Sequence, residues 1–122
     1  MKNLLPLFAT STLTLAILAC GDQTAPPADS TPRFVYVSPD PLGINPFLIM
    51  GQRGIEQAAA KHGAEAVVLE SEDPTTRAEN VRAAVDEGAT LVVVLGFEFN
   101  DIITEVAGEN PDIEFVIVDQ CI

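Results

Sequence analysis

Residues 33–47 read R-F-V-Y-V-S-P-D-P-L-G-I-N-P-F and combine an apolar run, a turn and the start of a helix. The apolar run at residues 34–38 predicts a strand that is buried on both faces, because a continuous run without alternation is typical of parallel sheets. Helical spacing begins at Pro46 and Phe47. Ligands of open α/β sheets bind beyond the carboxyl ends of the strands, so Asp40, Asn45 and Phe47 in this loop are candidate binding residues.

The rest of the chain repeats the alternation between strand and helix. The predicted strands lie at residues 34–38, 66–69, 91–95 and 115–118, and the helices between them at residues 47–62, 74–88 and 100–109. Gly63 ends the first helix, Asp73-Pro74 caps and starts the second, and Asn110-Pro111 stops the third. Single helices between strands imply parallel pairing with right-handed crossovers. We therefore predict an α/β fold, a doubly wound parallel βαβαβαβ sheet, and the pattern leaves the strand order open.

Composition limits the possible functions. A chain of 122 residues has room for one domain at most, and an apolar fraction of 48% is that of a globular protein. The 18 acidic residues outnumber the 6 basic ones, which argues against nucleic acid as a partner, since that needs clustered Lys and Arg. Two cysteines are too few for a disulfide framework.

The first 19 residues are predicted to be a signal peptide. Lys2 supplies a positive start, and the apolar run at residues 4–18 is too short and too rich in Thr and Ser for a transmembrane helix. The end of this run, I-L-A-C, resembles the lipobox of bacterial lipoproteins, and the resemblance implies cleavage before Cys20 and acylation of that residue. The alternative is a plain secretory signal. Residues 20–32 are then the lipidated cysteine and a Pro-rich polar tether with a reach of about 20 Å.

Catalytic and cofactor motifs are weak in this sequence. Neither G-x-G-x-x-G nor G-K-[ST] occurs, and no Ser or Cys has a base at a readable spacing. The single histidine, His62, is assigned a structural role, and no metal or cofactor is predicted. Asp40 and Asp119 at strand ends are suited to acid–base chemistry, but binding of hydroxyl and amine groups requires the same carboxylates. An enzyme is therefore the weaker reading.

The candidate loop residues also have structural interpretations that the sequence leaves open. Asp40-Pro41 is a turn signal, and Phe47 is equally suited to fill a core at the start of a helix. Asn45 before Pro46 has the spacing of a helix cap.

Two stretches resemble known families. Residues 40–47, D-P-L-G-I-N-P-F, with the following G-I-E-Q-A-A-A-K-H-G-A, resemble the first βα unit of periplasmic-binding-protein-like domains. The segment D-E-G-A-T-L-V-V-V-L-G-F-E-F-N-D at residues 86–101, with E-N-P-D-I-E-F-V-I-V-D after it, is similar to the Bmp family of basic membrane lipoproteins. That family provides the solute-binding subunits of nucleoside ABC transporters. The resemblance implies a two-lobed type I binding protein, with residues 33–122 as part of its N-terminal lobe.

The resemblance also implies a ligand site. An aspartate after the first strand, an aromatic residue in the next loop and an aspartate ending the fourth strand line the family's nucleoside site, and Asp40, Phe47 and Asp119 match them. The aromatic ring would stack on the base, while the carboxylates would accept hydrogen bonds from ribose hydroxyls or base N–H groups. Asn45 is a weaker match, and Phe97 would form a wall of the same crevice.

One departure bears on the ligand. The family's usual loop of the N-D-K-S-F-N-Q type is longer than the N-P-F found here, which resembles sugar-binding relatives. The implied function is a lipid-anchored receptor on the extracytoplasmic face of a bacterial membrane, which passes a nucleoside, preferably a purine nucleoside, to a permease. The alternatives are a sugar-binding relative, a ligand-sensing or adhesive surface lipoprotein, and a small hydrolase or transferase.

The end of the chain is a separate expectation. The sequence stops at Ile122, directly after the fourth predicted strand, which indicates a truncated chain whose last strand lacks cover on one face. Cys121 is expected to be a buried thiol or the partner of a cysteine in missing sequence. Residues 33–122 alone are expected to bind a ligand weakly, because half of a two-lobed site leaves the ligand wet on one face.

Overall fold

The computed structural model describes residues 30–120, and the predictions for the signal peptide, Cys20 and Cys121 lie outside these residues. The elements are β1 (Arg33–Ser38), α1 (Pro46–His62), β2 (Glu65–Glu70), α2 (Pro74–Asp86), β3 (Leu91–Leu95), the short 3₁₀ helix η1 (Phe97–Phe99), α3 (Asn100–Glu109) and β4 (Glu114–Val118). The predicted alternation is confirmed, and only η1 was not anticipated. No helix in the described part of the chain is long and apolar enough to cross a membrane.

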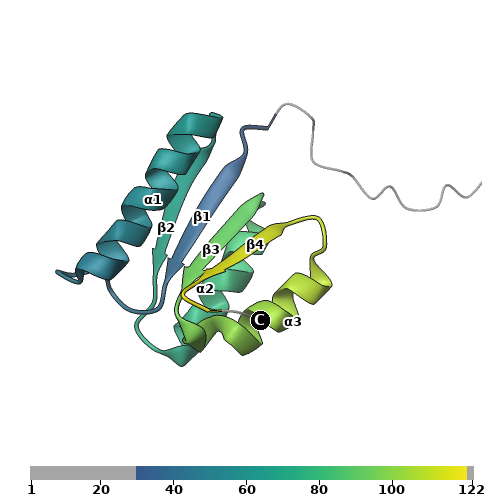
Figure 1. Cartoon of the computed structure of the whole chain (residues 1–122). Helices are drawn as coiled ribbons and strands as arrows, with labels where there is room; N and C mark the ends of the chain where they lie inside the picture. Colours follow the sequence, from purple (N-terminus) through teal and green to yellow (C-terminus); the bar gives the residue numbers. More distant parts are fainter. Residues whose placement is uncertain (1–29, 121–122) are drawn as a thin grey trace, which may run out of the picture.

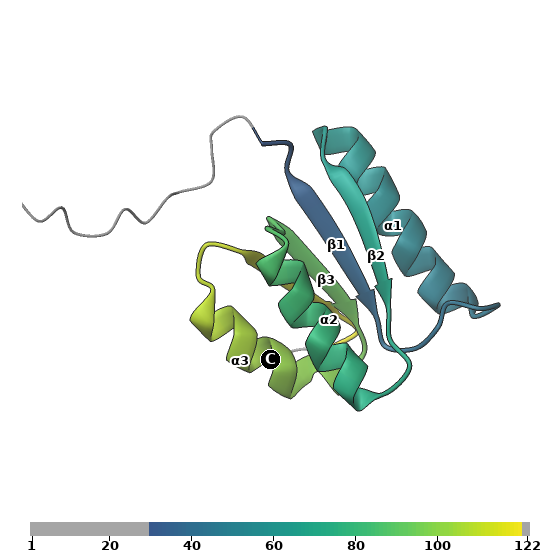
Figure 2. The same ribbon diagram turned by 180° about the vertical axis from the view of Figure 1, so that it is seen from behind.

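The four strands form one parallel sheet in the order β2-β1-β3-β4. Helix α1 lies on one face of the sheet, and α2 and α3 lie on the other (Figures 1 and 2). The central strand β1 is buried on both faces, since Val35, Tyr36 and Val37 are at most 1% exposed. These features confirm the prediction of a doubly wound α/β sheet.

Two apolar clusters hold the layers together. The larger one lies between the sheet and the α2–α3 layer, and its fully buried members include Val81, Val92, Val94, Phe99 and Val106. The smaller one lies under α1 and consists of Tyr36, Leu42, Leu48, Ile55 and Leu95. Helix α1 packs mainly on β1 and β2, less on β3, and leaves β4 largely uncovered.

Local sequence signals set the helix ends. Gly63 ends α1 in the left-handed conformation with φ of 65°, which glycine adopts without steric cost. Asp73 caps α2 through a capping box with Thr76, and Pro74 occupies the first helical position. The hydrogen bond from the backbone N–H of Thr76 is the main reason that the pKa of the Asp73 carboxyl is lowered.

Strand β4 is uncovered on the α1 side. The register places Val93 beside Val116 and Leu95 beside Val118, so all four side chains lie on the same face of the sheet. Helix α1 covers this face mainly over β1 and β2. Val116 is 44% exposed and Val118 is 39% exposed. The expectation that the last strand lacks cover on one face is confirmed for the described residues.

Candidate functional site

The carboxyl ends of β1, β3 and β4 meet at one edge of the sheet, because these strands are parallel neighbours. The loops after β3 and β4 are tied together there, since the N–H of Gly96 donates to the carbonyl oxygen of Val118 at 3.1 Å. Two predicted site residues follow directly in sequence: Phe97 after Gly96, and Asp119 after Val118. The loops that carry these two residues therefore lie next to each other at the edge.

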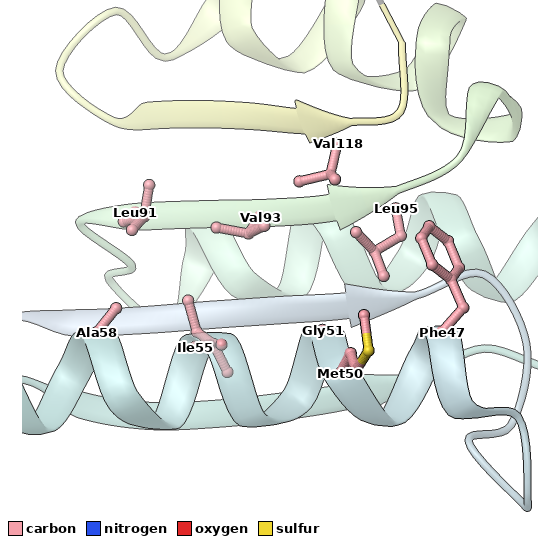
Figure 3. A pocket seen from close by; sticks show the side chains of 10 residues that line it. Phe47, Met50, Gly51, Ile55, Ala58, Leu91, Val93, Leu95 and Val118 are labelled. Atoms are coloured by element: carbon pink, nitrogen blue, oxygen red, sulfur yellow. The ribbon is translucent and has the colours of Figure 1, made fainter.

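An apolar groove runs from this edge along the sheet between α1 and β4. We call it the α1–β4 groove; it has a volume of about 330 Å³ and is lined by Phe47, Met50, Gly51, Gly54, Ile55, Ala58, Leu91, Val93, Leu95 and Val118. Figure 3 shows the ring of Phe47 at the end of the groove where the strands end, next to Leu95. Phe47 thus approaches the carboxyl edge from the helix side and Asp119 from the strand side.

Both candidate phenylalanines present their rings to solvent. Phe47 is 43% exposed and Phe97 is 69% exposed, whereas Phe99, two residues further along η1, is completely buried. The structure thereby rules out the alternative that Phe47 is a core residue at the helix start. Met50 lines the same groove and is also exposed, and Ile44 is an exposed apolar residue of the loop before α1. Large apolar side chains exposed together at a sheet edge commonly mark a binding surface.

Asp119 turns the chain at the end of β4 with φ of 71°. It is the only described residue other than glycine with a positive φ. Aspartate tolerates this left-handed conformation better than most residues, although the conformation is uncommon outside glycine. The side chain of Asp119 is exposed at the edge, beside the loop that carries Phe97.

Asp40 is turned toward the opposite layer. Its Oδ1 accepts a hydrogen bond from Nη2 of Arg77, a residue of α2, at 3.2 Å. Because α2 and α1 lie on different faces of the sheet, the Asp40 carboxylate does not lie in the α1–β4 groove with Phe47. It remains at the carboxyl edge, with 59% of its side chain exposed.

Asn45 has a structural task in this chain. Its side-chain oxygen accepts a hydrogen bond from the N–H of Phe47 at 3.0 Å, and it is the N-cap of α1. The capping interpretation that the sequence left open is therefore confirmed. The side chain holds Phe47 at the helix start, so Asn45 contributes to the site through the position of that ring.

Three residues with a role in this region were not among the candidates selected from the sequence. Arg77 donates to the loop after β1, Glu70 accepts a hydrogen bond from the N–H of Leu42 at 2.7 Å, and Tyr36 lies buried under α1. Burial is the main cause of the raised pKa of Tyr36, whose hydroxyl has no hydrogen-bond partner among the described residues. The sequence does contain a signal for Arg77. A helix that follows a parallel strand begins at the carboxyl edge of the sheet, so a charged residue near its start is a candidate for that edge.

The other parts of the described chain contain no stronger candidate for a ligand or metal site. No group of three or more potential metal ligands occurs within residues 30–120. A cavity of about 670 Å³ lies at the opposite, amino edge around Arg33, whose guanidinium pairs with Glu65 and Glu87 at 3.2 Å each. None of the five predicted ligand residues lines that cavity.

Comparison with known proteins identifies the family of this chain. A family model described as "ABC transporter substrate-binding protein PnrA-like", named Bmp, matches residues 32–122. The chain belongs to the Bmp family. A search of curated proteins found no match. Among solved structures, one titled "Crystal structure of putative lipoprotein from Peptoclostridium difficile 630 (fragment)" superposes with a TM-score of 0.64 and 19% identity, over 75% of this chain and 76% of that chain. At this identity the likeness concerns the fold alone.

Membership in the Bmp family settles the general class. Bmp proteins are solute-binding proteins of ABC transporters, a class without enzymatic activity, whose ligand is a small molecule and whose partner is the permease of the transporter. The four-strand parallel sheet is consistent with part of one lobe of a periplasmic-binding-protein-like fold. The resemblance predicted from the sequence is thus confirmed at the level of family and fold.

Proposed function

We propose that this Bmp protein captures a nucleoside, preferably a purine nucleoside, and delivers it to an ABC permease. Residues 33–122 would form part of the N-terminal lobe, and the ligand would lie at the carboxyl edge between this lobe and a second one. Closure of two lobes over a ligand buries it and thereby raises affinity.

The exposed rings of Phe47 and Phe97 are the observation that carries the proposal. Exposing a large aromatic ring to water is unfavourable unless a partner covers it, and a flat base is a suitable partner because it stacks on the ring. Asp119 follows β4 at the same edge of the sheet and offers a carboxylate for ribose hydroxyls or base N–H groups. A stacking surface next to a hydrogen-bond acceptor suits a ligand with an aromatic half and a hydroxyl-bearing half.

The ligand is tested by titrating guanosine, adenosine, inosine and ribose into the protein, with wild type compared to Phe47→Ala. We expect the nucleosides to bind and ribose to fail, and Phe47→Ala to weaken nucleoside binding by roughly tenfold or more, because base–aromatic stacking contributes about 1–3 kcal/mol. NMR titration is the suitable method, since it follows weak binding by one lobe.

The other outcomes are equally informative. Ribose binding without base preference would contradict the nucleoside proposal and favour a sugar-binding relative, which the short N-P-F loop at residues 45–47 resembles. Binding of neither nucleosides nor ribose would contradict the proposal and favour a sensing or adhesive lipoprotein. Unchanged affinity in Phe47→Ala would show that the exposed ring is not the stacking platform.

Membrane attachment is the second part of the proposal. Cys20 would carry the lipid, and residues 21–32 would form the tether that holds the domain on the extracytoplasmic face. Cells grown with labelled palmitate are expected to incorporate label into the wild-type protein and to lose it in Cys20→Ala. Incorporation that persists in Cys20→Ala, or is absent in wild type, would contradict lipid attachment at this residue.

A further inference from the structure

Arg77 connects α2 to the loop that follows β1. Its Nε donates to the carbonyl oxygen of Pro39 at 2.8 Å, and its Nη2 donates to Oδ1 of Asp40 at 3.2 Å. Only 16% of the Arg77 side chain is exposed, so the guanidinium is held between the helix and the loop. A planar guanidinium with two fixed bonds constrains its partners more than a single flexible contact does.

Within its helix, Arg77 has one favourable charge interaction, with the Asp73 carboxylate four residues earlier. Arg77 lies in the first turns of α2, where its backbone N–H donates to the carbonyl oxygen of the cap residue Asp73 at 3.1 Å. Cations near a helix N-terminus face the positive end of the helix dipole and are unfavourable there. The contact with Pro39 and Asp40 supplies a reason for an arginine at this position.

Further side-chain bonds fix the same loop. The Ser38 hydroxyl donates to the carbonyl oxygen of Asp40 at 2.6 Å, and the N–H of Leu42 donates to Oε2 of Glu70 at 2.7 Å. Ser38 is completely buried and Leu42 is 9% exposed. The loop from Pro39 to Leu42 is thus tied down on both sides of Asp40, and Arg77 is the residue that binds the Asp40 carboxylate itself.

We propose that Arg77 is a positioning residue that orients Asp40 and makes the site selective for ligands with hydroxyl groups. The proposal rests on the nucleoside-binding function above. The ion pair offers a carboxylate acceptor beside guanidinium donors, with most of the Asp40 side chain exposed. A hydroxyl group both donates and accepts, so it matches such a pair. Because the two charges compensate, the pair does not by itself select a cation.

The test compares guanosine with its 2′,3′-dideoxy analogue, which lacks the 2′- and 3′-hydroxyls and keeps the 5′-hydroxyl, by NMR titration of the full chain. The variant Arg77→Met keeps an unbranched side chain and removes the charge. Arg77→Lys keeps the charge but lacks the planar guanidinium with its several donors. The matched control is Arg82→Met, which removes another arginine of α2, paired with Glu105 at 2.8 Å on the surface. We expect Arg77→Met to weaken guanosine binding by about tenfold and to change binding of the dideoxy analogue less than twofold. Arg77→Lys should be intermediate.

Two results would overturn the proposal. Equal losses for guanosine and the dideoxy analogue would show a general structural effect, and no loss for guanosine relative to Arg82→Met would show that Arg77 does not act on the site.

Amide exchange of Leu42 gives a readout without any ligand. Its N–H is expected to exchange about tenfold faster in Arg77→Met than in Arg82→Met, because the loop loses the hydrogen bonds that Arg77 donates to Pro39 and Asp40. Unchanged exchange contradicts the positioning role. If wild type binds neither nucleoside, the proposed function fails, and the Leu42 exchange still decides whether Arg77 holds the loop.

Discussion

Replacing Phe99 with alanine is expected to lower the free energy of unfolding by about 3–5 kcal/mol, the usual loss for a buried aromatic ring. Phe99 is completely buried in the cluster between the sheet and the α2–α3 layer, together with Val94 and Ile103. Small domains are stable by about 5–15 kcal/mol, so this single change removes a large share. Urea unfolding followed by circular dichroism measures the loss.

Phe97→Ala is the matched control, because both rings belong to η1. Phe97 is 69% exposed, and its removal is expected to change the free energy of unfolding by no more than about 0.5 kcal/mol. The two variants separate the fold from the site: one ring stabilises the core, and the other is available to a ligand. Similar losses in both would contradict the assignment of Phe97 to the surface.

The elements could be predicted from the sequence because their signals are local. Asp73-Pro74 and Gly63 mark helix ends within a few residues, and the uninterrupted apolar run in β1 indicates burial on both faces. The strand order could not be predicted, because it depends on pairing between segments far apart in the chain. In the structure β1 separates β2 from β3, although β2 and β3 follow each other in sequence.

The candidate site was predictable only in outline. The strand ends identify which loops lie at the carboxyl edge, and Asp40, Phe97 and Asp119 are all found there. The exposure of Phe47 could not be predicted, because a phenylalanine in the first turn of a helix fits a core equally well. Its exposed fraction of 43% depends on how α1 packs on the assembled sheet.

Partners that are distant in sequence explain what was missed. Arg77 and Asp40 are 37 residues apart, and their ion pair exists only because the first turn of α2 and the loop after β1 reach the same edge. Asn45 shows the opposite case, since its cap on the N–H of Phe47 spans two residues and could be proposed from the sequence.

The two glycines on the groove side of α1 are expected to respond to alanine in opposite directions. A Cβ atom at Gly51 would lie 2.7 Å from Cδ1 of Leu95 and 2.8 Å from Cζ of Tyr36, whereas no atom lies within 4 Å of a Cβ at Gly54. Alanine in place of a helical glycine gains about 0.5–1 kcal/mol, which Gly54→Ala should realise in full. Overpacking typically costs about 1–3 kcal/mol, so Gly51→Ala should be destabilised on balance, and Gly51→Val more strongly.

Urea unfolding midpoints of the two alanine variants measure this difference, and Tyr36 provides a further test of its cause. The Tyr36 hydroxyl would lie 2.9 Å from the new Cβ, and it has no hydrogen-bond partner among the described residues. Removing it in Tyr36→Phe should therefore restore part of the stability lost in Gly51→Ala, because the hydroxyl is one of the atoms that the new methyl group meets. Leu95 Cδ1 and the ring Cζ, which phenylalanine keeps, still oppose the methyl group, so the recovery should be incomplete. A stabilised Gly51→Ala would contradict this packing, since it would mean that α1 can move away from β1 and β3 without loss.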